Sequence, residues 1–218
     1  MRTILAPARE GQEAAVRMLL LPPAYAGPDD FLRAGFASAV RERRLGLDLV
    51  FAPLEFAHVT DRSIIARLHQ AVLQPAQQAR CPLWLGGISL GGFVALRCAE
   101  EYPQQLAGLC LFAPYLGSYI MTGEIERARG THAWEPGEAS EDDDERRVWR
   151  FVKTRAARFP IHLGMAHGDR FVDRHALLAA ALPAADVDRV EGGHDWPTWR
   201  RLWDNFLDAR FARLAARA

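Results

Sequence analysis

Short runs of apolar residues alternate along the chain with longer segments in which apolar residues recur every three or four positions. The short runs have the length of buried strands, whereas the longer periodic segments are typical of amphipathic helices. Predicted strands cover residues 16–21, 47–52, 82–86, 106–112, 161–166 and 187–190. Predicted helices cover residues 28–44, 61–79, 92–100, 173–182 and 195–218. Strands that alternate with helices predict an α/β fold, a mostly parallel sheet of about six strands with helices on both faces.

A Gly-x-Ser-x-Gly pentapeptide occupies residues 87–91, between a predicted strand and a predicted helix. A serine between two glycines at a strand-to-helix turn has the sequence of a nucleophile elbow. Because that turn is sharp, the residues flanking the serine must lack side chains that would clash. Ser89 is therefore the candidate nucleophile. The backbone N–H of Leu90, at the start of the helix, is a candidate donor to an oxyanion.

Two later strands are each followed by a loop with acidic and histidine side chains. Asp169 follows the strand at 161–166, and His194 follows the strand at 187–190. In a parallel sheet the carboxyl ends of the strands form one edge, where sites gather. A histidine can take the proton of a serine hydroxyl, and a carboxylate can orient the imidazole. The order Ser89, Asp169, His194 therefore predicts a catalytic triad.

With this order and placement, the chain resembles an α/β-hydrolase from about residue 15 to its end. The stretch Gly-Gly-His-Asp-Trp at 192–196 is also similar to the histidine loop of esterase D-like and mycolyltransferase-like enzymes. The resemblance implies one α/β-hydrolase domain over residues 1–218, with a short lid-like insert at about 114–160.

Other histidines and acids compete for the roles in the triad. His167 follows a strand and is the alternative base, although a structural place beside the acid loop is favoured. Asp173 and Asp195 are alternative acids, but each is expected at the start of a helix, where a carboxylate caps backbone N–H groups. His162 lies inside a predicted strand and is expected to be a packed core residue with satisfied nitrogens.

The second oxyanion donor is expected from the turn after the strand at 16–21. Many members of the resembled family carry His-Gly where this chain has Pro22-Pro23. Proline has no N–H, so neither of these residues can donate. The family pattern then places the donor at the N–H of Ala24, with Tyr25 as the alternative. The other interpretation is that the two prolines merely end a strand.

The insert carries large side chains that line an acyl or aryl pocket, form a small core, or do both. They are Tyr115, Tyr119, Met121, Trp134, Trp149, Phe151 and Phe159. An acidic run at 140–145 resembles a cation site. The favoured interpretation is a cap at Ser140 with acids in the first helical turn, and no metal is expected. In the last predicted helix, apolar residues at helical spacing favour packing on the sheet over a membrane surface, and Trp196 is expected to hold the histidine loop.

The length and charge of the chain narrow the partners further. Its 218 residues fit one domain with a substantial core, and 27 basic residues balance 27 acidic ones, which argues against a nucleic-acid partner. We find neither a secretory signal nor an apolar run of membrane-spanning length. Cys81, Cys98 and Cys110 lack metal-ligand spacing and are expected to be reduced and buried in a cytoplasmic protein.

The leading functional prediction is a serine hydrolase that cleaves small carboxylic esters through an acyl-enzyme on Ser89, without a cofactor. The partner is then a small-molecule ester or thioester, because thioester hydrolysis and acyl transfer use the same residues. The alternative is a non-catalytic binding member of the fold, which the loss of His-Gly favours. An activated Ser89 distinguishes the two. The sequence does not fix the oligomeric state.

Overall fold

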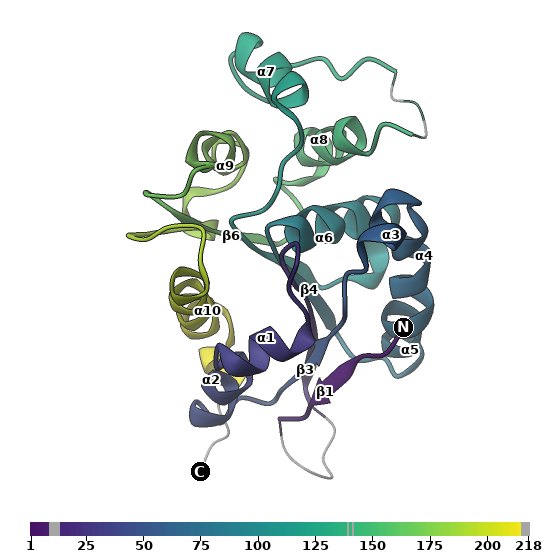
Figure 1. Cartoon of the computed structure of the whole chain (residues 1–218), viewed down its shortest axis with the longest axis vertical. Coiled ribbons are helices and arrows are strands. Elements are labelled where there is room, and N and C mark those ends of the chain that lie inside the picture. Colours follow the sequence, from purple (N-terminus) through teal and green to yellow (C-terminus); the bar gives the residue numbers. More distant parts are fainter. Residues whose placement is uncertain (9–13, 139, 141, 215–218) are drawn as a thin grey trace.

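In the computed structural model, which describes residues 1–8, 14–138, 140 and 142–214, a seven-stranded sheet forms the centre of the molecule (Figure 1). The strands are β1 (Ile4–Ala6), β2 (Val16–Leu21), β3 (Leu47–Phe51), β4 (Leu83–Ile88), β5 (Gly108–Phe112), β6 (Ile161–Ala166) and β7 (Val187–Val190). Their order across the sheet is β1-β3-β2-β4-β5-β6-β7, and each neighbouring pair except β1–β3 is parallel. The six predicted strands correspond to β2–β7, so the predicted α/β fold is confirmed.

The seventh strand, β1, was not predicted from the sequence. It pairs antiparallel with β3 at the edge of the sheet, with Ile4 opposite Phe51. A strand of three residues is too short to show a periodic pattern of apolar and polar positions. Its pairing covers backbone groups of β3 that would otherwise be left at an open sheet edge.

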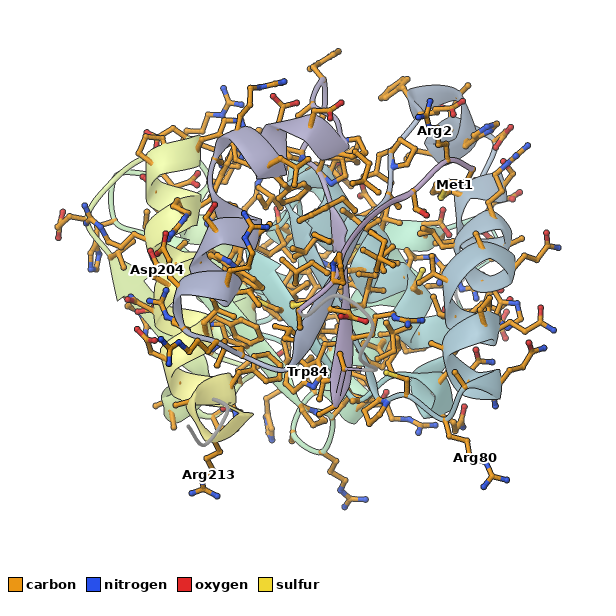
Figure 2. All side chains as sticks on the ribbon, turned by 90° about the horizontal axis from the view of Figure 1, so that it is seen from below. Met1, Arg2, Arg80, Trp84, Asp204 and Arg213 are labelled. Carbon is orange, nitrogen blue, oxygen red and sulfur yellow. The ribbon has the colours of Figure 1, made fainter. Side chains whose placement is uncertain are left out.

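Helices cover both faces of the sheet. On one face lie α1 (Pro28–Arg33), α2 (Phe36–Glu42) and α10 (Trp196–Phe211), and on the other lie α4 (Ser63–Leu68), α5 (Gln74–Gln78), α6 (Leu90–Glu101) and α9 (Val172–Ala179). Figure 2 shows the two sides, with Asp204 on α10 and Arg80 just beyond α5. Alternate residues of a strand point to opposite faces, so Leu20 packs in one core and Leu19 in the other.

Two predicted helices are interrupted. The helix predicted at 28–44 is divided into α1 and α2 at Gly35, whose φ of +80° is a conformation that glycine adopts readily. The helix predicted at 61–79 is present as α4, a π-helical turn at His69–Leu73, and α5. The short helix α3 (Phe56–Thr60) was not predicted, because none of its side chains is buried and it has no apolar stripe.

The insert at 114–160 contains α7 (Tyr119–Arg127) and α8 (Asp144–Arg155), which lie beyond α6 and beside α9 at the top of Figure 1. Most of its large side chains belong to the core on the α6 face of the sheet: Met121, Trp134, Trp149 and Phe151 are buried, and Tyr115 and Phe159 pack against them. Trp149 also donates its indole N–H to the carbonyl of Leu116 (2.8 Å). The core interpretation therefore holds for these residues, and this core is continuous with the main one.

The acidic run begins α8. The helix is capped by Asp143, whose carboxylate accepts the N–H of Arg146 (2.9 Å), so the predicted cap at Ser140 is wrong. Asp144 and Glu145 lie in the first turn, as predicted, where acids interact favourably with the helix dipole. Glu141 of the same run lies outside the described residues.

The C-terminal helix α10 packs on the sheet as predicted, with Trp199, Leu202, Trp203, Phe206, Leu207 and Phe211 buried. Residues 215–218 of the predicted helix lie outside the described residues. Across the described part of the chain, no helix is long and apolar enough to cross a membrane. The three cysteines are free thiols, and Cys98 and Cys110 are buried as predicted, whereas Cys81 is only half-buried.

His162 is packed in the core, but its nitrogens are not satisfied. Its ring lies 5.0 Å from that of Phe206, and neither Nδ1 nor Nε2 has a hydrogen-bond partner, so the prediction of a satisfied histidine is wrong. Burial, together with the nearby charge of Arg210, lowers the pKa of His162 from 6.5 to about 4. The histidine is therefore neutral at pH 7 in the folded protein.

We expect the His162→Leu variant to keep its stability under mild acid better than the natural protein. The unfolded chain protonates His162 near pH 6.5 while the folded protein does not until about pH 4, so the natural protein loses stability as pH falls through this window. The whole loss amounts to roughly 3 kcal/mol. Melting temperatures at pH 7.5 and pH 5 measure it. The exposed-site variant His132→Leu is the control and should show the natural pH dependence; an equal pH dependence in His162→Leu would contradict the expectation.

Candidate active site

Ser89 lies between the end of β4 and the start of α6, with φ +50° and ψ −113°. A positive φ is uncommon for a residue other than glycine, and such strain persists only where the surrounding structure holds it. Two backbone hydrogen bonds do so here. The N–H of Ser89 donates to the carbonyl of Phe112 (3.0 Å), and its carbonyl accepts the N–H of Tyr115 (2.8 Å). The conformation is that of a nucleophile elbow.

The glycines around Ser89 are required by close backbone packing. A Cβ atom on Gly87 would lie 2.2 Å from the carbonyl of Gly91, and a Cβ on Gly91 would lie 2.3 Å from the carbonyl oxygen of Leu21. Neither distance leaves room for a side chain. The second contact also places the turn after β2 directly against the first turn of α6.

The loops after β6 and β7 bring the candidate acid and base together. Asp169 Oδ2 and His194 Nδ1 are 2.7 Å apart. Two backbone hydrogen bonds of 3.0 Å join the loops, from the N–H of His167 to Val190 and from the N–H of Gly168 to Gly192. Among the described residues, Ser89 makes no hydrogen bond to His194. The bond from nucleophile to base often tightens only when substrate is bound.

The carboxyl group of Asp169 is buried and nevertheless charged. Burial alone would raise its pKa, but the hydrogen bond with His194 and the N–H of Phe171, which donates to Oδ1 (2.8 Å), outweigh this effect. The pKa of Asp169 is therefore below its usual value of 3.8. A charged carboxylate at this position fixes the imidazole orientation and favours its protonated form.

Two aromatic rings hold the imidazole of His194 edge to face. The rings of Phe171 and Trp199 lie 5.3 Å and 5.1 Å from it. Trp196 packs on Trp199 (5.3 Å), so it supports the imidazole through that ring, and its role in holding the histidine loop stays a prediction. Trp199 belongs to the apolar stripe of α10, which predicts burial but no contact with His194, and no sequence pattern marks Phe171.

The competing residues have other places. The side chain of His167 is exposed. Asp195 caps α10 as predicted, accepting the N–H of Thr198 (2.9 Å). Asp173 lies in the first turn of α9, but the residue at the cap position is Phe171, so the predicted cap is wrong.

The turn after β2 carries the candidate second oxyanion donor. Pro22 and Pro23 are buried, whereas Ala24 and Tyr25 are exposed in a turn closed by the N–H of Ala26 on Pro23 (3.3 Å). Tyr25 has a φ of +63°. On the other side of the elbow, Leu90 is the first residue of α6, where a backbone N–H has no partner within the helix. Leu90 thus follows Ser89 directly, and the contact of Gly91 with Leu21 brings the β2 turn to the first turn of α6.

Residues 56–208 match the model of a protein family named Esterase and described as "Putative esterase". The matched segment spans more than half of the chain and includes Ser89, Asp169 and His194. The chain belongs to this esterase family. No protein of curated function matches its sequence.

Solved structures support the same fold. Est1E from Butyrivibrio proteoclasticus is 13% identical, with a TM-score of 0.60 over 95% of this chain and 93% of that one. The S-formylglutathione hydrolase FrmB from Staphylococcus aureus is 12% identical, with a TM-score of 0.59 over 88% and 79%. The S-formylglutathione hydrolase from Agrobacterium tumefaciens is 15% identical, with a TM-score of 0.56 over 94% and 86%. At these identities the likeness shows the α/β-hydrolase fold, and the resemblance found in the sequence is confirmed.

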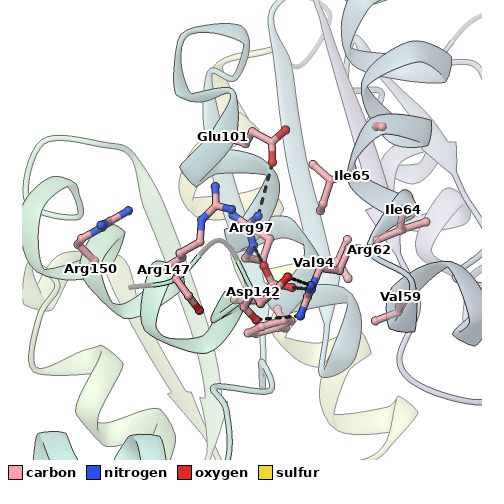
Figure 3. Close-up of a pocket in the computed structure, with 14 residues that line it drawn as sticks. Val59, Arg62, Ile64, Ile65, Val94, Arg97, Glu101, Asp142, Arg147 and Arg150 are labelled. Atoms are coloured by element: carbon pink, nitrogen blue, oxygen red, sulfur yellow. Dashed lines mark hydrogen bonds and ion pairs between the residues drawn. The ribbon is translucent and has the colours of Figure 1, made fainter. Parts of the chain in front are cut away.

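A groove made of two adjoining pockets, which share Val59 and Phe93, lies along α6 of the esterase and reaches Leu90, although neither pocket is lined by Ser89 or His194. Its inner part, about 480 Å³, is lined by Leu90, Phe93, Tyr115 and the carboxylates of 142–145. Its outer part, about 530 Å³, is shown in Figure 3 and is lined by several arginines, including Arg97.

Arginines neutralise several of the acids in the groove. Arg62 pairs with Asp142, and Arg97 pairs with Asp144 (2.8 Å). In the described part of the chain, no group of three or more histidine, cysteine or acidic side chains is placed to hold a metal ion. Asp142, Asp143 and Asp144 of the acidic run are thus ion-paired side chains at the start of a helix.

Proposed function

We propose that this esterase cleaves small carboxylic esters through an acyl-enzyme formed on Ser89. His194 takes the proton of the Ser89 hydroxyl as the oxygen attacks the ester carbonyl, and it returns this proton to the departing alcohol. Water then attacks the acyl-enzyme, with His194 again as the base. One observation carries the proposal: the 2.7 Å hydrogen bond between Asp169 and His194 in loops at the same sheet edge as the strained elbow of Ser89.

Asp169 keeps the imidazole in the tautomer that accepts the proton from serine. Its carboxylate accepts the Nδ1–H of His194, which leaves Nε2 as the basic nitrogen. When His194 becomes protonated, the buried negative charge stabilises the imidazolium. The lowered pKa of Asp169 supports this role, because the group is ionised across the neutral pH range.

The N–H of Leu90 and the N–H of Ala24 are the proposed oxyanion donors, with Tyr25 as the alternative to Ala24. Charge develops on the carbonyl oxygen as Ser89 attacks, and N–H groups fixed in advance stabilise it. The contact between Gly91 and Leu21 supports this assignment, because it holds the β2 turn against the start of α6.

The size of the inner groove supports small substrates. About 480 Å³ beside Leu90 fits a short acyl or aryl group, with Phe93 and Tyr115 as apolar walls. Thioester hydrolysis and acyl transfer would use the same residues on a different leaving group or acceptor. Two further predictions stand beside the function: residues 1–218 form one domain with a lid-like insert at 114–160, and the protein is cytoplasmic.

A fluorophosphonate probe tests the nucleophile without a choice of substrate. We expect the purified protein to be labelled at one serine, and labelling to disappear in Ser89→Ala and to fall to background in His194→Ala, because only an activated serine reacts. The variant Ser38→Ala, on α2, is the matched control and should label like the natural protein. If the folded natural protein is not labelled, the proposed function is wrong and a binding role takes its place.

A further inference from the structure

Arg174 is a buried cation that the proposed triad does not use. The residue lies on α9 and is 7% exposed. Within the described chain no carboxylate pairs with it, and its one hydrogen bond runs from Nη1 to the carbonyl of Gly117 (3.3 Å). A mostly buried guanidinium without an ion pair in its own chain is uncommon, because burial of a charge is costly. Such an arginine is a candidate site for an anion from outside the chain.

The ring of Phe171 lies between the guanidinium of Arg174 and the imidazole of His194, the proposed base. The guanidinium is 5.5 Å from the ring of Phe171, which in turn lies 5.3 Å from the imidazole of His194. On its outer side it is covered by the ring of Tyr119 (3.7 Å), which is 80% exposed. Nε and Nη2 of Arg174 make no hydrogen bond in the described chain. Both atoms are also accessible to solvent. The fully buried nitrogen and oxygen atoms that lack a partner in the described chain all belong to other side chains, so Nε and Nη2 of Arg174 are not among them.

The carboxylates nearby are engaged elsewhere. Glu145 lies beside Gly117, and its two oxygens accept hydrogen bonds from Tyr115 (2.9 Å) and Ser118 (2.7 Å). Asp169 is bonded to His194 and to the N–H of Phe171. Neither carboxylate forms an ion pair with Arg174 within 4.0 Å, so Nε and Nη2 of Arg174 remain available to a ligand.

The position of Arg174 places it near the alcohol part of the ester rather than the acyl part. His194 must hand its proton to the leaving alcohol, so the alcohol part of the ester lies beside the imidazole. Two rings flank the imidazole. Trp199, on α10, is buried in the core, whereas Phe171 is only half-buried and lies between the imidazole and Arg174. The pocket that reaches Leu90 lies along α6 instead, and neither Phe171 nor Arg174 lines it.

We infer that Arg174 binds a carboxylate carried by the alcohol or thiol part of the substrate. The planar guanidinium presents parallel N–H groups that match the two oxygens of a carboxylate. Tyr119 covers one face of the guanidinium, so the carboxylate approaches along its edge, at Nε and Nη2. This inference rests on the proposed function and specifies the substrate class of the same site.

Two pairs of esters that differ only in charge test the inference. Para-acetoxybenzoate and its methyl ester place the charge on the alcohol part, whereas p-nitrophenyl hemiglutarate and p-nitrophenyl pentanoate place it on the acyl part. For Arg174→Gln, we expect the ratio of kcat/KM for para-acetoxybenzoate to that for its methyl ester to fall by about 10- to 100-fold, mostly through KM. The corresponding ratio for the acyl pair should not change. Arg174→Lys keeps the charge and should retain part of the preference.

Arg170→Gln is the matched control. The Arg170 guanidinium lies 4.8 Å from the same Phe171 ring, but its side chain is exposed, so this variant should keep both ratios.

Circular dichroism shows whether each variant is folded, and if Arg174→Gln is not, Arg174→Lys carries the test. Equal losses for both members of the alcohol pair would mean that Arg174 only fixes the start of the insert, and the inference would fail. A fall in the kcat/KM ratio of the acyl pair would mean that Arg174 binds a carboxylate on the acyl part, and this result would also overturn the inference. Fluorophosphonate labelling of the same samples separates these failures from failure of the proposed function, which abolishes labelling.

Discussion

Replacing Ser89 with alanine is expected to lower kcat/KM for a simple ester by about 10⁴-fold or more, and His194→Ala should cost about as much. The serine supplies the bond-forming oxygen, and the histidine removes its proton, so neither can act without the other. The double variant should therefore lose little beyond either single one. Residual activity would come from the oxyanion donors and substrate binding alone.

The same experiment identifies the acid. Asp169→Asn keeps the shape of the side chain but favours the wrong tautomer of His194, and should cost about 10³- to 10⁴-fold in kcat. Asp195→Asn is the matched control, because asparagine also caps a helix and should leave kcat nearly unchanged. Initial rates with p-nitrophenyl acetate measure all of these variants. Losses that multiply in the Ser89→Ala/His194→Ala double variant would show that the two residues do not act as one unit.

The strands and the candidate triad could be read from sequence because their signals are local. A buried strand between turns appears as an apolar run, and the elbow of Ser89 appears as two glycines around a serine. Asp169 and His194 could be placed because each follows such a strand, and parallel strands bring their carboxyl ends to one edge. The fold class followed from the same alternation.

The features that sequence reasoning missed depend on distant contacts. Phe171 and Trp199 flank His194 only because the loops after β6 and β7 are joined by backbone hydrogen bonds. Likewise, the pattern around His162 showed a buried strand, but whether its nitrogens find partners depends on α10 packed above it.

The insert shows the same limit. Its large side chains could line a pocket or form a core, and both possibilities have the same composition. The structure buries Trp149 and Met121 in the core and leaves Tyr119 exposed above Arg174. The sequence contained Arg174 as one of many arginines, and only its burial without a carboxylate distinguishes it. Local sequence patterns thus predicted the candidate catalytic residues, whereas tertiary packing determines which side chains surround them.

Gly91→Ala is expected to destabilise the protein strongly and to impair the active site. The new methyl group would lie 2.3 Å from the carbonyl oxygen of Leu21 and 2.7 Å from that of Pro22, so the backbone of one element must move. Overpacking of this kind costs about 3 kcal/mol or more, which corresponds to a fall in Tm of roughly 10 °C for a protein of this size. Thermal unfolding followed by circular dichroism measures it, and any folded protein should show a lower kcat.

Gly123→Ala separates this steric effect from helix propensity. Gly123 also lies inside a helix, α7, but its added methyl group would meet only the flexible end of Arg127 at 3.3 Å. Alanine is the better helix former by about 1 kcal/mol, so this control should raise Tm or leave it unchanged. A Gly91→Ala variant with the same Tm and kcat as the control would mean that the β2 turn does not press on α6. The proposed oxyanion donors would then lose the contact that supports their assignment, because the close approach of Gly91 to Leu21 is what brings the β2 turn to the start of α6.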